Sequence, residues 1–116
     1  MERIMLLSKI HSAVLTGAEL DYEGSITIDA DLLKRADMLP GEQVHVLNKN
    51  NGQRIVTYTI AGDRGSGEIT LNGPAARCGQ IGDKVTILSY GRFSEEQAKL
   101  YKPKVVLVDE RNQVKE

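Results

Sequence analysis

The stretch EQVHVLNKNNGQRIVTYTI, residues 42–60, decides the kind of fold that this chain can adopt. Val44 and Val46 alternate with polar residues, which is the pattern of a strand with one buried face. The Asn-Gly pair at 51–52 supplies the positive φ angles of a tight turn, and residues 55–60 return as the partner strand. The centre of the sequence therefore predicts a β-hairpin.

Segments on both sides of this hairpin predict further short strands. Residues 3–16 carry closely spaced apolar and β-branched residues without helix caps, which favours one or two strands buried on one side. The segment GAELDYEGS (17–25) is typical of a turn or extended chain. The other predicted strands are ITID (26–29), ITLNG (69–73), KVTILSY (84–90) and KVVLV (104–108). Many short strands with glycine-rich turns favour a mainly β barrel or sandwich.

Two short helices are predicted between these strands. Asp29 is suited to cap ADLLKRADML (30–39), and the Pro-Gly pair at 40–41 is expected to end that helix. Ser94 begins a capping box, which predicts a second helix through about Lys99. Strands nevertheless outnumber helices.

The length of 116 residues predicts a single domain, residues 1–116, with one modest core. The longest apolar runs are too short to span a membrane and the first residues lack a secretory signal, so we expect no membrane association and a cytoplasmic location. Cys78, the one cysteine, cannot form an internal disulfide, and we expect it to be a small buried hydrophobic residue.

Charge and composition argue against three kinds of site. The net charge is −1, the 15 basic residues are scattered and aromatic content is 4%, so no nucleic-acid surface is expected. His11 and His45 lack partners at metal-ligand spacing, so no metal site is expected. RGSGE (64–68) lacks the Lys-Ser/Thr pair of a phosphate-binding loop and favours a hairpin loop instead.

The pair Gly24-Ser25, within LDYEGSITID (20–29), would by itself indicate a turn before a strand. It occurs together with three other segments. The four are Lys9-Ile10-His11, Asp21-Tyr22-Glu23-Gly24-Ser25, Arg54-Ile55-Val56-Thr57-Tyr58 and Leu71-Asn72-Gly73-Pro74-Ala75-Ala76. In this order and spacing they closely resemble the aspartate α-decarboxylase family, pyruvoyl-dependent lyases that make β-alanine for pantothenate and coenzyme A. The similarity runs from Met1 to about Pro103.

The resemblance implies a six-stranded double-psi β-barrel with short helices, a homotetramer, and a zymogen that cleaves itself between Gly24 and Ser25. Its products would be a β chain, residues 1–24, and an α chain, residues 25–116, in which Ser25 becomes a covalent pyruvoyl group. Glycine tolerates backbone angles that a Cβ forbids, and Ser25 Oγ would be the nucleophile. Thr57 occupies the family position that stabilises the oxyanion. Whether another protein assists maturation is left open.

The resemblance also assigns roles in decarboxylation of L-aspartate. The pyruvoyl group would form a Schiff base with the substrate and delocalise the carbanion that remains when CO2 leaves. Arg54 would bind the side-chain carboxylate at two points through its planar guanidinium group, and Lys9 would be a second cation. Tyr58 occupies the family position of the proton donor. The remaining implied residues are Thr57, Asn72, Gly73, Pro74 and Ala75 around the substrate, with His11 and Tyr22 in support.

Two positions depart from the family pattern. Many relatives have Ala where this chain has Pro74, and proline lacks the N–H that could contact substrate. We therefore expect that contact from the N–H of Ala75, and a stiffer loop. Leu47 stands where some relatives have a large aromatic residue, which leaves the shape of the pocket open.

Strand parity constrains the implied site. Residues two apart share a face of a strand, so Arg54 and Tyr58 share one and Thr57 faces the other way. In a regular strand, Thr57 and Tyr58 cannot both face one pocket. Their roles then require a bulge, a backbone contact from Thr57, or a site at a subunit boundary, and we favour the boundary.

Two alternatives come from other classes of protein. The segment LPGEQVHVL (39–47) also resembles the swapped-hairpin units of small bacterial DNA-binding regulators. That hypothesis needs a basic face, and it leaves Gly24-Ser25 and residues 54–58 unexplained. The second alternative is a barrel that does not catalyse and serves as an interaction module.

Overall fold

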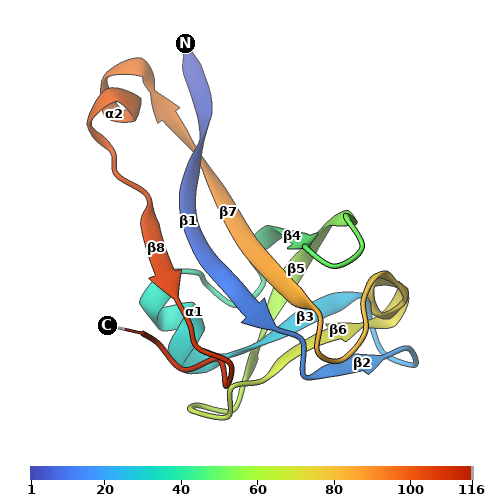
Figure 1. Cartoon of the computed structure of the whole chain (residues 1–116). Helices are drawn as coiled ribbons and strands as arrows, with labels where there is room; N and C mark the ends of the chain where they lie inside the picture. The colour runs from blue at the N-terminus through green and yellow to red at the C-terminus, as the bar shows by residue number, and fades with distance from the viewer. Residues whose placement is uncertain (116) are drawn as a thin grey trace.

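The computed structural model describes residues 1–115, which form a mainly β protein (Figure 1). In this part of the chain the strands are β1 (Glu2–Val14), β2 (Gly17–Glu19), β3 (Ser25–Asp29), β4 (Gln43–Asn48), β5 (Arg54–Gly62), β6 (Ile69–Asn72), β7 (Lys84–Ser94) and β8 (Lys104–Leu107). The helices are α1 (Ala30–Ala36), the 3₁₀ helix η1 (Gly73–Cys78) and α2 (Glu95–Leu100). One sheet runs through the strands in the order β2-β6-β3-β5-β4-β7-β1-β8.

The prediction of a mainly β fold is confirmed, but the count of six strands is wrong for residues 1–115. The sheet has 8 strands, because the short strands β2 and β8 pair at its two ends. β2 lies in the segment predicted to be a turn or extended chain, and it pairs in parallel with β6. The hydrogen-bonded order is that of an open sheet that ends on these two strands.

The central hairpin is formed by β4 and β5, as predicted. Its antiparallel register pairs Gln43 with Tyr58 and Leu47 with Arg54. Val44 and Val46 are buried, and Gly52 takes a φ of +76° in the turn. On its other edge, β5 pairs with β3 only from Thr59 onward. Within the described sheet, the edge of residues 54–58 that faces away from β4 therefore has no partner strand.

Both capped helices begin where the sequence predicts. The Asp29 carboxylate accepts a hydrogen bond from the backbone N–H of Asp31 at 2.8 Å, and the capping box of Ser94 opens α2. The predicted end of the first helix is wrong. α1 ends at Ala36 because Asp37 adopts a left-handed conformation with φ 57°, and its N–H binds the last carbonyls of the helix. The Pro-Gly pair at 40–41 lies beyond this end.

The two longest strands, β1 and β7, pair antiparallel and lie side by side, and α2 lies beyond the end of β7 (Figure 1). Bulges interrupt β1 near Leu7 and His11, and Ser12 has a positive φ of 57°. The inward face of the sheet and one face of α1 enclose the core. Its fully buried large side chains include Ile10, Leu15, Ile26, Ile28, Leu32, Ile69, Leu71 and Ile87. Among the helices of residues 1–115, none is long and apolar enough to cross a membrane.

Candidate functional site

The Gly24-Ser25 junction lies where the chain passes from the surface into the core. Residues 20–24 form an exposed loop after β2, and Tyr22 in it is 57% exposed. Ser25, the first residue of β3, is completely buried. The peptide bond between them therefore has an exposed glycine on one side and a fixed, buried hydroxyl on the other.

Asn72 holds that hydroxyl in place. Ser25 and Asn72 are directly paired between β3 and β6. The Asn72 Nδ2 group donates to Ser25 Oγ and to Thr27 Oγ1, at 2.9 Å in both cases. Ser25 Oγ in turn donates to the carbonyl oxygen of Glu23 at 3.2 Å. Because Asn72 is itself buried, this network fixes Ser25 Oγ beside the junction.

Gly73 brings the start of η1 against the same junction. It has a φ of +64°, and a Cβ placed there would lie 2.6 Å from the Tyr22 carbonyl oxygen and 2.8 Å from the Gly24 nitrogen. Real Cβ atoms do not approach other atoms so closely, so only glycine fits here. Pro74 follows at the start of η1, where its missing N–H costs no helical hydrogen bond. The loop 22–24 and the segment 73–74 therefore pack as one unit.

A surface hollow of about 420 Å³ lies beside this unit. Its lining residues are Gly24, Ile55, Val56, Thr57, Tyr58, Pro74, Ala75 and Cys78. Thr57 and Tyr58 thus border the same hollow, although they alternate between half-buried and exposed along β5. Lining one hollow does not require both side chains to face it, so the parity argument, which asks for a bulge, a backbone contact from Thr57 or a subunit boundary, stays a prediction. Cys78 is partly exposed rather than buried.

Other implied residues lie on the outward face of the sheet. Arg54 and Tyr58 flank Val56 on this face, and Leu47 pairs directly with Arg54. His11 lies two residues beyond Lys9 on β1. One register row crosses the four strands from β1 to β5 through Lys9, Leu88, His45 and Val56. The register therefore places Lys9, Leu47, Arg54 and Tyr58 on one surface.

Arg54 extends along this outward face over β4 and β7. Its Nε donates to His45 Nδ1 at 3.3 Å, and its Nη2 donates to the Tyr90 hydroxyl at 2.9 Å. The rings of His45 and Tyr90 contact each other edge-on, with centroids 4.9 Å apart. Arg54 does not line the hollow beside Gly24. One chain consequently presents the junction and the outward cations at two separate places.

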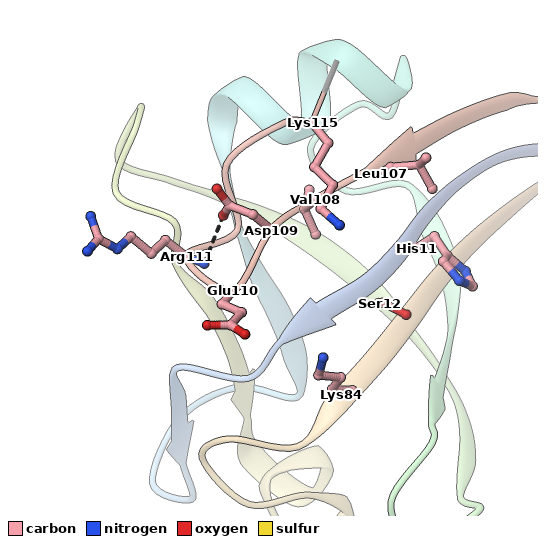
Figure 2. Close-up of a pocket in the computed structure, with 9 residues that line it drawn as sticks. All are labelled: His11, Ser12, Lys84, Leu107, Val108, Asp109, Glu110, Arg111 and Lys115. Carbon is pink, nitrogen blue, oxygen red and sulfur yellow. Dashed lines mark hydrogen bonds between the residues drawn. The ribbon is translucent and has the colours of Figure 1, made fainter.

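His11 borders a second, larger hollow of about 690 Å³. Figure 2 shows His11 and Ser12 of β1 on one side of it and residues 107–111 on another. Asp109 is held in the turn that follows β8, where the backbone N–H groups of Gln113 and then Arg111 lower the pKa of its carboxyl group. Both signs of charge surround the hollow, and the residues of the Gly24-Ser25 junction do not line it.

The structure thus sorts the implied site residues into two sets. Around the junction it brings together Gly24, Ser25, Thr57, Tyr58, Asn72, Gly73, Pro74 and Ala75. Lys9, His11 and Arg54 lie elsewhere in the same chain. Sequence reasoning missed Thr27, although its spacing of two from Ser25 places it on the same face. It also missed His45 and Tyr90 as partners of Arg54. In residues 1–115, no three His, Cys, Asp or Glu side chains form a group suited to a metal ion.

Comparison with known proteins gives a consistent result. A family model described as aspartate decarboxylase matches residues 1–115. Aspartate 1-decarboxylase of Thermoanaerobacter pseudethanolicus is 57% identical over 112 residues, which cover 97% of this chain and 96% of that protein. The protein of the same name from Listeria monocytogenes is 54% identical over 114 residues, with coverage of 98% and 90%. The one from Cupriavidus necator is 53% identical over 116 residues, with coverage of 100% and 97%.

Proposed function

Because the chain belongs to the aspartate decarboxylase family, we propose that it removes the α-carboxylate of L-aspartate to give β-alanine and CO2. The observation that carries this proposal is the Gly24-Ser25 junction, where a buried serine hydroxyl held by Asn72 lies next to a glycine on a surface hollow. Because the chain belongs to this family, we prefer the decarboxylase hypothesis to the DNA-binding regulator and to the non-catalytic module. The product would supply pantothenate and coenzyme A biosynthesis in the cytoplasm.

A pyruvoyl group at position 25 fits the residues around it. It would be made from Ser25 itself, at the start of β3, and so needs no separate binding site. Because Gly73 has no Cβ, the backbone of residues 22–24 fits against it. The hollow beside Gly24 gives access to position 25 from the surface. The chemistry that the group supplies is an electron sink for the carbanion formed when CO2 departs.

The residues at the junction support the self-cleavage that we propose. In the proposed reaction, the Gly24 acyl group moves from the Ser25 nitrogen to Ser25 Oγ, and elimination then releases residues 1–24 with a terminal carboxylate. Hydrolysis of the new N-terminal residue releases ammonia. Asn72 holds Oγ at 2.9 Å, which restricts its position before attack. Thr57 lines the same hollow as Gly24, and its hydroxyl would stabilise the oxyanion.

Substrate binding is assigned to the outward face of a second subunit. Arg54 would bind the side-chain carboxylate, Lys9 would add positive charge, and Tyr58 would deliver a proton to Cα. The separation of Arg54 and Lys9 from the Ser25 junction in one chain supports a site assembled between subunits, as in the proposed homotetramer. The N–H of Ala75 would contact the substrate in place of position 74, with Asn72 and Gly73 beside it and His11 and Tyr22 in support.

Three finer features belong to the same proposal. The six central strands would close as a double-psi β-barrel, with β2 and β8 as additions to it. The chain would act as one domain, and another protein could assist its maturation. The parallel pairs β3–β5, β2–β6 and β1–β8 within an otherwise antiparallel sheet are compatible with such a crossed topology.

The mass of the denatured protein tests cleavage directly. We expect two fragments divided at Gly24-Ser25, with the larger one lighter by one ammonia than simple hydrolysis predicts, because position 25 loses its amine and becomes a ketone. The Ser25→Ala variant should remain one chain of 12.8 kDa and release no CO2 from L-aspartate. Full decarboxylation by an uncleaved chain, or by Ser25→Ala, would show that the proposed mechanism is wrong.

A further inference from the structure

Arg54 is a positive charge held by neutral partners. Its side chain donates hydrogen bonds to the His45 ring nitrogen and to the Tyr90 hydroxyl, at 3.3 and 2.9 Å. No carboxylate in residues 1–115 forms a salt bridge with it. An acidic partner would neutralise the guanidinium and compete with an incoming carboxylate. Neutral partners orient Arg54 and leave its charge available.

The three side chains lie diagonally across three strands. His45 on β4 pairs with Val56, so Arg54 is its diagonal neighbour on β5. On the other side, His45 pairs with Leu88 of β7, and Tyr90 is again the diagonal neighbour. Long and aromatic side chains on one face of a sheet can reach across such diagonals. The edge-on contact of the His45 and Tyr90 rings then limits the movement of both.

The chemistry of arginine determines the direction of both bonds. A guanidinium has five N–H donors and no acceptor, so His45 Nδ1 and the Tyr90 oxygen must accept. His45 therefore carries its ring proton on Nε2 while this contact exists. The two bonds occupy Nε and one Nη2 hydrogen of Arg54. Both Nη1 hydrogens and one Nη2 hydrogen remain, which suffices for a two-point contact with a carboxylate.

We propose that His45 and Tyr90 are positioning residues, which hold the Arg54 guanidinium ready for the side-chain carboxylate of the substrate. This inference rests on the proposed function, in which Arg54 is the carboxylate ligand. Free arginine side chains lose much rotational freedom when they bind. Here part of that ordering is already complete in the unliganded protein, so the two contacts strengthen substrate binding without taking part in bond breaking.

Steady-state kinetics of fully cleaved protein test the proposal. In His45→Leu the acceptor is lost, and we expect KM for L-aspartate to rise about tenfold with kcat within about twofold of the wild-type value. His45→Asn places an amide oxygen near the Nδ1 position and should restore most of the affinity. Tyr90→Phe keeps the ring and removes the hydroxyl, and it should give a smaller rise in KM. Inhibition by succinate, which has both carboxylates but no amine, should weaken in parallel.

Tyr101→Phe is the matched control. The Tyr101 hydroxyl donates to the Leu7 carbonyl at 2.7 Å and not to Arg54, His45 or Tyr90, so its loss should reduce thermal stability and leave KM unchanged. An unchanged KM in both His45→Leu and Tyr90→Phe, with an active wild type, would overturn the positioning role alone. Equal loss of affinity in His45→Leu and His45→Asn would also overturn it. A wild-type protein that is cleaved but does not decarboxylate L-aspartate would remove the proposed function, and this inference with it.

Discussion

At the scale of single residues, Asn72 connects the fold to the proposed chemistry. Both of its amide hydrogens are used, one on Ser25 Oγ and one on Thr27 Oγ1, and the side chain is buried. A buried amide in such a network cannot be replaced without leaving other polar atoms unpaired. The residue that holds the proposed nucleophile is therefore also a residue that stabilises the pairing of β3 with β6.

Asn72→Ala should impair cleavage and stability together. It leaves Ser25 Oγ and Thr27 Oγ1 without their donor, which costs about 1–3 kcal/mol of unfolding free energy. Without the hydrogen bond from Asn72, Ser25 Oγ samples more positions, so cleavage should be slower. Mass spectrometry should then show slower accumulation of the two fragments. Thr27→Val is the control, because it removes only the second contact. It should lose stability and still be cleaved, and a cleavage defect equal to that of Asn72→Ala would argue against a separate role for the Ser25 contact.

The sequence predicts single residues well where one rule of backbone chemistry applies. Asp29 caps a helix, Ser94 opens a capping box and Gly52 turns a hairpin, because each needs only its sequence neighbours. Gly73 depends on the backbone of the 22–24 loop, which is distant in sequence. Likewise, the contacts of Arg54 with His45 and Tyr90 depend on the register of three strands, which a single sequence does not display.

At the scale of elements, ends and edges proved harder to predict than the elements themselves. The helix α1 ends at Ala36 because Asp37 adopts a left-handed conformation, whereas the pattern of apolar residues continues further. The hairpin β4–β5 was predictable from its alternation and turn. The unpartnered edge at residues 54–58 follows only from where β3 begins to pair, and this edge produces the shared hollow of Thr57 and Tyr58.

Asp37→Gly should stabilise the protein through the end of α1. Asp37 has a φ of 57°, a region where glycine avoids the Cβ penalty, and the gain is about 1 kcal/mol. The substitution also removes the exposed contact of Asp37 with Lys104 at 3.7 Å, which contributes little. Urea unfolding should show a higher midpoint. Asp37→Ala loses the same ion pair without gaining conformational freedom, so a midpoint as high as that of Asp37→Gly would contradict the explanation.

Asp83, in the connection between η1 and β7, should make part of the stability depend on pH. The side-chain amide of Asn48, and then the backbone N–H of Gln80, donate to its carboxylate and lower its pKa below the usual range. A lowered pKa in the folded state adds stability above the unfolded pKa, and this is lost as pH falls through the folded value. In Asp83→Asn, the midpoint of unfolding should fall less than in the wild-type protein as the pH is lowered. An unchanged acid profile would show that other carboxylates dominate.

At the scale of the whole molecule, the two separate sets of residues argue for a site shared between copies. The junction around Ser25 lies at one hollow, and Arg54 and Lys9 lie on the outward face of β5, β4, β7 and β1. The sequence predicts both sets through family resemblance, and strand parity indicates a boundary. The distance between the sets in one chain becomes apparent only from the fold.

Mixed oligomers test this arrangement. Ser25→Ala and Arg54→Ala should each abolish or strongly reduce decarboxylation when expressed alone. Co-expressed with distinct tags and purified as hybrids, they should recover about a quarter of the wild-type activity, because random assembly pairs an intact junction with an intact Arg54 at that frequency. Hybrids with no activity above the sum of the single variants would place both residues in the same subunit's site.

The position of β1 has a further consequence for the mature protein. β1 lies between β7 and β8 and pairs with both, and it belongs to the part of the chain that precedes Gly24. After cleavage, the smaller fragment would remain as an interior strand of the sheet, bound only by noncovalent contacts. The enzyme would then be a split protein, whose thermal midpoint rises with its own concentration. A synthetic peptide of residues 1–24 should be able to exchange for the native fragment.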